Sequence, residues 1–528
     1  MTAAALLLVS ACGSSSSEGG SEGEKTGKDV SANVRGGDQL ARGTATKGGS
    51  LTAAVSTPIE SLDPTQFIGF GALTAAHGIY GQLMKYADST GAAEPDLAES
   101  LTTDDYVNWT LTLREGVNFT DGTPLNADAV IAHLKRYTSE GATAFDAGSV
   151  RNAIKSTVKK DDLTVELTTN GPNYEFAAIF TGQAGMVPSP KAVEADPTGY
   201  AQNPVGAGSF KVKSFKPGGD MVLEANQDYY DAKLPHLDEL KLTTVPDSQT
   251  RLSGLKAGDV DIAALSDPNA LNQAAEDSGL TVLNQSSPGY YVQLNLSSAP
   301  FEDERVRQAL LQAIDIDALT KAVFDGRGEP FEGWFLSANP YKADVEFPKH
   351  DVEAAEKLVA EYEAEGGDAS FTLQVLGNEV HQRMATLIQQ MLKKVGIAVK
   401  IDVVEQPVLT TSAGSGTYQA QMRSTNVVAN TNVSTLSDRY DSASMVNYGK
   451  AGIPAVDAIL KDLRDTVPTE RTQQQFTDLQ QALAEWIPTI PLSEQNEAWV
   501  VKSKVGGFPG STFQGNEEFD PTTVWAQK

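Results

Sequence analysis

The sequence predicts an α/β protein with two or more lobes, and three observations carry that prediction. The chain has 528 residues, about three to four times the size of an ordinary domain. Hydrophobic residues make up 40% and charged residues 21%, a globular balance that can fill a large core. Residues 371–404 read as strand, helix and strand, a unit that makes its two strands parallel. We therefore expect part of the sheet to be parallel.

Local signals predict the other elements in chain order. Apolar and polar residues alternate over 107–113, which predicts a half-buried strand. Asn126 is placed to cap the helix that follows it. The Lys-Pro-Gly-Gly turn at 216–219 separates two apolar runs and predicts a hairpin. Asp303 and Asp317 are the expected N-caps of two further helices. In the 371–404 unit, a stripe of Met, Leu and Val at helical spacing is expected to pack against the sheet.

Charge and cysteine content exclude several classes of partner. Acidic residues outnumber basic ones by 69 to 41, so the formal net charge is −28. Nucleic acid and anionic lipid both need a basic face, so neither is expected as the primary partner. Apolar runs are shorter than the roughly 18–20 residues of a transmembrane helix. The single cysteine excludes an internal disulfide framework and a cysteine-based zinc cluster.

The N-terminal sequence predicts where the protein works. Apolar residues are followed by Ser-Ala-Cys-Gly, and this run resembles a bacterial lipobox in which Cys12 becomes lipid-modified. We therefore expect a signal peptide over 1–11 and a flexible, Gly/Ser/Glu-rich lipoprotein tether over 12–47. No Lys or Arg precedes the apolar run, which leaves the true translation start open. An ordinary buried cysteine is the alternative interpretation.

Motifs of enzymes and metal sites are missing from the sequence. The histidines are scattered, without HExxH or an i,i+4 pair, and no metal site is predicted. Neither a GxSxG elbow nor a GxGxxG loop after a strand is present, so no cofactor is expected. A secreted, carboxylate-dependent hydrolase stays open as an alternative, because two carboxylates facing across a cleft leave no spacing signature.

An ordered set of short motifs resembles the extracytoplasmic solute-binding proteins of family 5, the peptide, oligopeptide and nickel receptors of ABC importers. The resemblance covers the chain from about residue 48 to its C-terminus. Each motif is weak alone, and their order is the family's. The matching segments are 62–64, 80–83, 94–100, 109–119, 121–124, 203–208, 226–230, 258–261 and 300–309. Arg305 and Arg307 in the last segment are expected to pair with carboxylates rather than with a ligand.

The resemblance implies a two-lobed periplasmic-binding-protein fold of type II, in its large peptide-binding-like form. Lobe one is expected over 48–292 and 490–528, with an inserted subdomain near 85–203, and lobe two over 293–489. It further implies a monomer that is not an enzyme and that delivers its ligand to an ABC permease driven by an ATPase. The expected location is the outer face of the cytoplasmic membrane, with contact to the membrane through the lipid anchor only. A ligand-binding chaperone or signalling module on the same fold is an alternative.

Lobe two carries an indication of the ligand's charge. In peptide-binding relatives an aspartate of this lobe pairs with the peptide's α-amino group. From 406 to 437 this chain has no Asp or Glu, and Arg423 is its only charge. Either Asp438 or Glu405 takes that role, or the ligand has no amine to hold.

Arg423 can hold a carboxylate or phosphate, and Asn426 and Asn430 can serve amides or hydroxyls. We therefore expect a neutral or anionic ligand, such as a blocked peptide, an opine-like conjugate or a sugar. A surface ion pair is the alternative for Arg423.

Aromatic residues near the expected cleft complete the candidate site. Aromatic walls bind apolar side chains or sugar faces without reading sequence. The candidates are Phe67, Phe70, Tyr290, Tyr291 and Trp334. Each alone is also compatible with a place in the core, and Trp334 is the strongest candidate.

Overall fold

The structure is a computed structural model. It describes residues 44–66, 68–86, 93–144, 146–324, 329–331, 333–335, 339, 341–424, 433–444, 446–467, 470–508 and 518–527. Cys12, the predicted signal peptide and most of the predicted tether lie outside the described residues. Among the helices of the described part, none has the length and apolar character needed to cross a bilayer.

One large sheet runs through both halves of the molecule, in the order β15-β14-β16-β12-β17-β11-β1-β10-β9-β8, with β13 paired to β17. Its strands are β1 Ser50–Val55, β8 Phe210–Phe215, β9 Met221–Ala225, β10 Glu239–Thr244, β11 Ile262–Leu265, β12 Leu280–Leu294, β13 Glu329–Pro330, β14 Phe371–Leu376, β15 Val399–Val404, β16 Ala420–Ser424 and β17 Thr489–Lys502.

Smaller sheets carry the remaining strands. A four-stranded sheet has the order β4-β5-β7-β6, and β2 pairs with β3 and β18 with β19. These strands are β2 Met84–Tyr86, β3 Ala93–Pro95, β4 Ala98–Thr103, β5 Asn108–Leu113, β6 Ile154–Lys159, β7 Thr164–Thr169, β18 Val505–Gly506 and β19 Trp525–Ala526.

Helices cover these sheets. The α-helices are α1 Phe70–Tyr80, α2 Ala127–Tyr137, α3 Ala147–Ala153, α4 Pro190–Ala195, α5 Ser248–Ala257, α6 Pro268–Ala275, α7 Glu304–Ala313, α8 Ile316–Val323, α9 Val352–Ala364, α10 Glu379–Lys394, α11 Gln406–Ser415, α12 Val433–Tyr440, α13 Pro454–Asp465 and α14 Gln473–Trp486. Short 3₁₀ turns are η2 Phe176–Thr181, η3 Gln183–Gly185, η4 Tyr200–Gln202 and η6 Pro521–Thr523.

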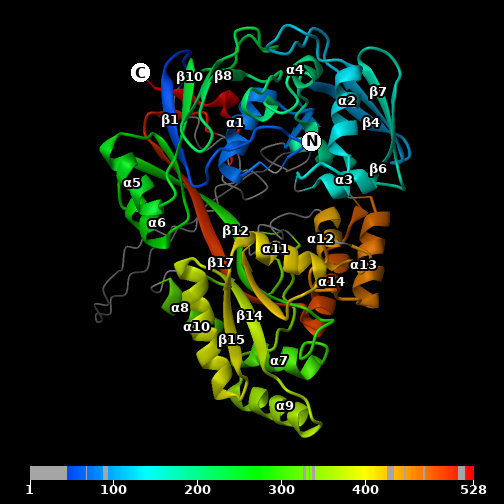
Figure 1. The fold of residues 1–528 in the computed structure, drawn as a ribbon, viewed down its shortest axis with the longest axis vertical. Helices are drawn as coiled ribbons and strands as arrows, with labels where there is room; N and C mark the ends of the chain where they lie inside the picture. The colour runs from blue at the N-terminus through cyan, green and yellow to red at the C-terminus, as the bar shows by residue number, and fades with distance from the viewer. Residues whose placement is uncertain are drawn as a thin grey trace, which may run out of the picture.

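The described residues form two lobes joined by β12 and β17 (Figure 1). One core gathers side chains of β1, α1 and β8–β11, and a second gathers those of α7, α10 and β14–β16. The two joining strands pair antiparallel from Leu280–Lys502 to Gln293–Thr489. The boundaries predicted near 292 and 490 fall within these strands, and the four-stranded sheet, inside the predicted subdomain, has its own core. The domain boundaries themselves remain predictions.

The strand–helix–strand prediction for 371–404 is confirmed. Here β14 and β15 are parallel neighbours joined by α10, whose buried face packs into the core of lobe two. The hairpin prediction around 216–219 is also confirmed, because β8 and β9 pair antiparallel. Both signals are local, and the core could therefore be anticipated from the chain alone.

Two of the three predicted helix caps are confirmed. Asn126 accepts a hydrogen bond from the Ala129 amide, and Asp303 accepts one from the Arg305 amide. The prediction for Asp317 is wrong, because Asp315 caps α8 and Asp317 lies in its first turn. Asp315 and Asp317 are two residues apart in the sequence, and the apolar spacing of the predicted helix favoured Asp317 as its N-cap.

The two arginines of the last family motif differ in their partners. Arg305 pairs with Asp303 and Glu365, as expected. For Arg307 the expectation is wrong, because its guanidinium donates to the backbone carbonyls of Phe301, Glu302 and Trp486. It thereby ties the start of α7 to the end of α14.

Candidate functional site

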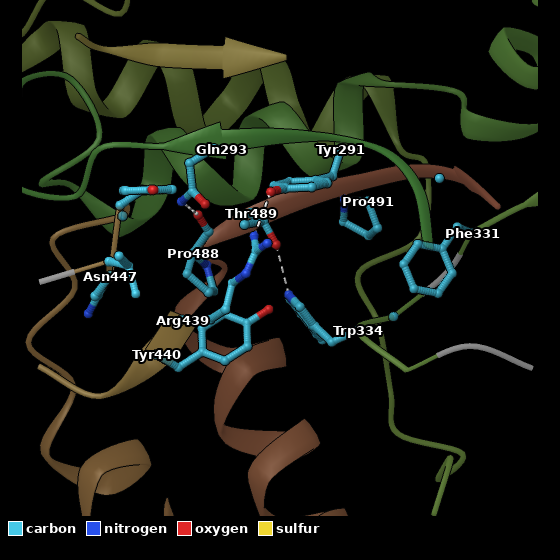
Figure 2. A pocket seen from close by; sticks show the side chains of 15 residues that line it. Tyr291, Gln293, Phe331, Trp334, Arg439, Tyr440, Asn447, Pro488, Thr489 and Pro491 are labelled. Carbon is cyan, nitrogen blue, oxygen red and sulfur yellow. Dashed lines mark hydrogen bonds between the residues drawn. The ribbon is translucent and has the colours of Figure 1, made fainter. Parts of the chain in front are cut away.

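A cavity opens beside the strands that join the lobes (Figure 2). It holds about 610 Å³ of empty space, a volume that includes space open to solvent. Its walls combine tyrosine, tryptophan and phenylalanine rings with a few polar groups. The lining residues are Gly289, Tyr291, Gln293, Phe331, Gly333, Trp334, Arg439, Tyr440, Val446, Asn447, Tyr448, Gly449, Pro488, Thr489 and Pro491.

Trp334 forms one wall of the cavity. Its indole Nε1 donates a 2.9 Å hydrogen bond to Oγ1 of Thr489, the first residue of β17. Its ring packs 5.0 Å from that of Phe347, and only 3% of the residue is exposed. The preceding residue is Gly333 with φ +119°, a backbone conformation that favours glycine. Trp334 is therefore both a core residue and a cavity wall.

Arg439 and Tyr291 form another part of the cavity lining. Nη1 of Arg439, near the end of α12, donates a 2.8 Å hydrogen bond to the hydroxyl of Tyr291 on β12. Tyr440 follows on the same helix, and burial raises the pKa of its phenol well above the ordinary value. The phenol therefore stays neutral at pH 7 and can both donate and accept. Figure 2 shows Arg439, Tyr440 and Trp334 converging on Thr489.

Arg423 lies behind the cavity wall on β16, with 9% of the residue exposed. Its guanidinium carbon is 4.8 Å from the ring centre of Tyr448, a cavity residue. Nη1 donates a 2.8 Å hydrogen bond to Oε1 of Gln421, and the buried Nε has no hydrogen-bond partner. Within the described part of the chain, no carboxylate pairs with Arg423.

Neighbours fix the orientation of Gln421. The residue is fully buried, and its Nε2 donates to Gln374 Oε1, to the Leu409 carbonyl and to Ser412 Oγ. Since the amide nitrogen is committed to these three acceptors, the amide oxygen faces Arg423. The guanidinium is therefore held in place by a neutral acceptor.

The predicted site residues fall into three groups. Tyr291 and Trp334 line the cavity, and Arg423 stands next to it. Tyr290 lies on the other face of β12, where its ring packs 6.0 Å from Phe324 and 5.4 Å from His381. The remaining candidates are Phe67, Asn426 and Asn430, which lie outside the described residues, and Phe70, which begins α1 and whose side chain is not described.

The two acids considered as amine anchors do not line the cavity. Asp438 accepts a 3.0 Å hydrogen bond from Ser149 Oγ, and burial raises the pKa of its carboxyl. Glu405 is exposed at the start of α11. Within the described ranges, no group of three His, Cys, Asp or Glu side chains could hold a metal ion.

Several cavity residues were not found from the sequence. They are Gln293, Phe331, Arg439, Tyr440, Asn447, Tyr448 and Thr489. Only Gln293 and Thr489 carried a usable signal, since both lie at the boundaries predicted between lobe one and lobe two. Arg439 and Tyr440 end α12, and Asn447 and Tyr448 follow it. All four reach the cavity through tertiary packing, which no local pattern encodes.

Comparison with known proteins shows which family and which proteins this chain resembles. The sequence profile of "Bacterial extracellular solute-binding proteins, family 5 Middle" matches residues 92–446. The oligopeptide-binding protein AppA of Bacillus subtilis is 26% identical over 539 residues, covering 95% of this chain and 93% of AppA. The glutathione-binding protein GsiB of Escherichia coli O157:H7 is 28% identical over 360 residues, covering 67% of this chain and 69% of GsiB.

Solved structures show the same two-lobed fold. AppA in complex with a nonapeptide superposes with a TM-score of 0.77 at 22% identity, covering 92% of this chain and 100% of AppA. AgaA from A. tumefaciens R10 in complex with agropinic acid gives a TM-score of 0.79 at 25% identity, covering 91% and 99% of the two chains. The profile match spans most of the chain, and this chain belongs to the bacterial extracellular solute-binding proteins of family 5.

Proposed function

We propose that this chain is the substrate-binding component of an ABC importer and that its ligand carries a carboxylate and no free amine. The observation that carries the ligand class is Arg423, a buried guanidinium with an unpartnered Nε and no carboxylate partner among the described residues. Arg423 lies directly behind Tyr448 of the cavity wall, and an anionic ligand in the cavity lowers the electrostatic cost of burying a guanidinium that faces no carboxylate.

The rest of the cavity supports this ligand class. Arg439 brings a second guanidinium to the wall, and among the described residues that line the cavity there is no Asp or Glu. Tyrosine and tryptophan rings can cover the uncharged part of a ligand. One relative fits this chemistry, because it was solved in complex with agropinic acid, which is an acid.

A free peptide is the second candidate, because AppA is an oligopeptide-binding protein and was solved with a nonapeptide. A peptide has a carboxylate for Arg423 and also an α-amino group that needs an acceptor. The described cavity residues provide no carboxylate for it. An anionic ligand without a free amine therefore fits this cavity better than a peptide does.

The proposal includes the cellular context. Cys12 is lipidated after removal of residues 1–11, and the tether to residue 47 leaves the lobes free at the outer face of the cytoplasmic membrane. The protein acts as a monomer, binds without turnover and passes its ligand to a permease with its ATPase. Replacement of Cys12 by Ser tests the anchor: the protein is expected to leave the membrane fraction, and retention there would contradict it.

Mass spectrometry of small molecules released by denaturing the purified protein tests the ligand class. Receptors that close over a ligand can retain it through purification. One carboxylate-bearing compound supports the proposal, and a series of short peptides with free amines contradicts it. If the protein is purified empty, a thermal-shift screen with agropinic acid and a free peptide decides, because a ligand raises the melting temperature by mass action.

A further inference from the structure

The inserted subdomain contacts lobe two at a place remote from the joining strands. Figure 1 shows α3 of the subdomain directly above α12 of lobe two. Oγ of Ser149 on α3 donates a 3.0 Å hydrogen bond to Oδ2 of Asp438 on α12. These residues are 289 positions apart in the chain. Since they belong to different lobes, this bond exists only while the lobes are closed.

Glu175 makes the stronger contact across the same boundary. It directly precedes η2, and its Oε1 accepts a 2.8 Å bond from Nη1 of Arg471 and a 3.1 Å bond from the Val433 amide. The side chains are 16% exposed for Glu175 and 5% for Arg471. Hydrogen bonds between charged partners with so little solvent around them are stronger than surface ion pairs.

Lobe two positions Arg471 before the lobes meet. Nε of Arg471 donates a 3.1 Å bond to the Leu463 carbonyl in the last turn of α13. Val433 is likewise fixed, as the first residue of α12. Both donors are therefore already oriented in lobe two, and Glu175 arrives from lobe one as their shared acceptor.

The helix held by Glu175 also builds the cavity. Val433 begins α12, and Arg439 and Tyr440 near its end line the cavity, whereas Glu175 and Arg471 do not. We propose that Glu175 is an interlobe latch, which closes the receptor on Arg471 and Val433 and couples closure to the cavity through α12. Glu175 is thus a positioning residue, and it acts whichever solute the cavity binds.

A latch of this kind sets the apparent affinity without contacting the ligand. Measured affinity is the intrinsic affinity multiplied by the fraction of molecules in the binding-competent state. In the open form the Glu175 carboxylate is hydrated, so its removal costs little there. Loss of the latch therefore shifts the open–closed equilibrium and leaves the stability of each lobe nearly unchanged.

Electron–electron distance measurements on the full chain without ligand test the latch. Spin labels at Lys155→Cys on β6 and Asp478→Cys on α14, both exposed positions, report the separation of the subdomain from lobe two. Cys12→Ser removes the only native cysteine. With Glu175→Ala we expect the closed-to-open ratio to fall about tenfold, the factor for losing one charge-assisted hydrogen bond.

The matched control is Asp441→Ala. Asp441 pairs with Arg464 within lobe two at 2.6 Å, and its side chain is also 16% exposed. This variant should keep the wild-type distances. Arg471→Ala should open the receptor as Glu175→Ala does, and the double variant should open it no further. Unchanged distances in both single variants, or a lowered melting temperature with unchanged distances, would overturn the latch.

Discussion

Nε1 of Trp334 lies 2.9 Å from Oγ1 of Thr489, and this hydrogen bond joins a cavity wall to the start of a strand that links the lobes. Both residues are buried, with 3% and 6% exposed. Movement of β17 relative to lobe two must therefore carry Trp334 along or break the bond.

Thr489→Val tests the cost of that bond. Valine keeps the shape of threonine but leaves the buried indole N–H without its acceptor. We expect the free energy of unfolding to fall by about 1–3 kcal/mol, measured by urea denaturation. Thr489→Ser keeps a hydroxyl and is the control. A valine variant as stable as wild type would show that the indole finds another acceptor.

Arg423→Met separates binding from stability. Methionine fills a similar volume without a buried charge, which offsets the loss of the donor to Oε1 of Gln421, so the apo protein should stay close to wild type in thermal unfolding. Affinity for a carboxylate ligand, measured by calorimetry with agropinic acid, should fall at least tenfold, about 1.4 kcal/mol. Lower stability together with unchanged affinity would place Arg423 in the scaffold.

Arg305→Met is the matched control for that experiment. Arg305 is anchored by Asp303 and Glu365 and does not line the cavity. Its replacement should leave the affinity unchanged, because it removes only a partly exposed ion-pair cluster. Loss of affinity in this variant would indicate that any buried or partly buried arginine of lobe two supports binding indirectly.

The raised pKa of Asp96 leads us to expect that the stability of lobe one depends on pH. Its carboxyl accepts bonds from the Tyr230 hydroxyl and the Gln82 amide, yet burial, with Asp520 nearby, raises its pKa to about 6. The folded state therefore holds this proton more tightly than the unfolded chain, whose pKa is near 3.8. The contribution of Asp96 to stability should fall as pH rises from about 4 to about 6 and stay low above that.

Asp96→Asn should remove this loss, measured as the difference in urea stability from wild type at several pH values. The stability of this variant relative to wild type should increase as pH rises. Asp105→Asn is a control of opposite sign, because hydrogen bonds from Asn108 lower the pKa of Asp105 to about 2. The stability of that variant relative to wild type should decrease as pH rises from about 2 to about 4. A pH-independent difference for Asp96→Asn would contradict the raised pKa.

The local part of the structure was predictable, and the site was predictable only in part. Helix caps at Asn126 and Asp303 rest on a side chain three residues or fewer from its partner. Arg439 reaches Tyr291 across 148 positions, and only the packing of α12 against β12 decides that contact. Arg423 could be recognised as a candidate site residue because its segment contains no acidic residues, which is a compositional signal.

Tyr290 and Tyr291 give the sharpest comparison, because they are neighbours in sequence with opposite surroundings. Successive side chains of a strand point to opposite faces. Tyr291 therefore faces Arg439 in the cavity, whereas Tyr290 packs on Phe324 and His381. Composition made both candidates for the site, and the register of β12 distinguishes them.

Alanine variants of Tyr290 and Tyr291 should therefore have two separate effects. Tyr291→Ala should weaken ligand binding in calorimetry, because it removes a cavity wall and the acceptor that orients Arg439. Tyr290→Ala should leave affinity nearly unchanged and lower the free energy of unfolding by roughly 1–3 kcal/mol through lost packing. Tyr291→Phe isolates the hydroxyl, since the ring remains while Arg439 loses its acceptor. If Tyr290→Ala reduces affinity as much as Tyr291→Ala, the two faces of β12 are coupled and the cavity does not end at Tyr291.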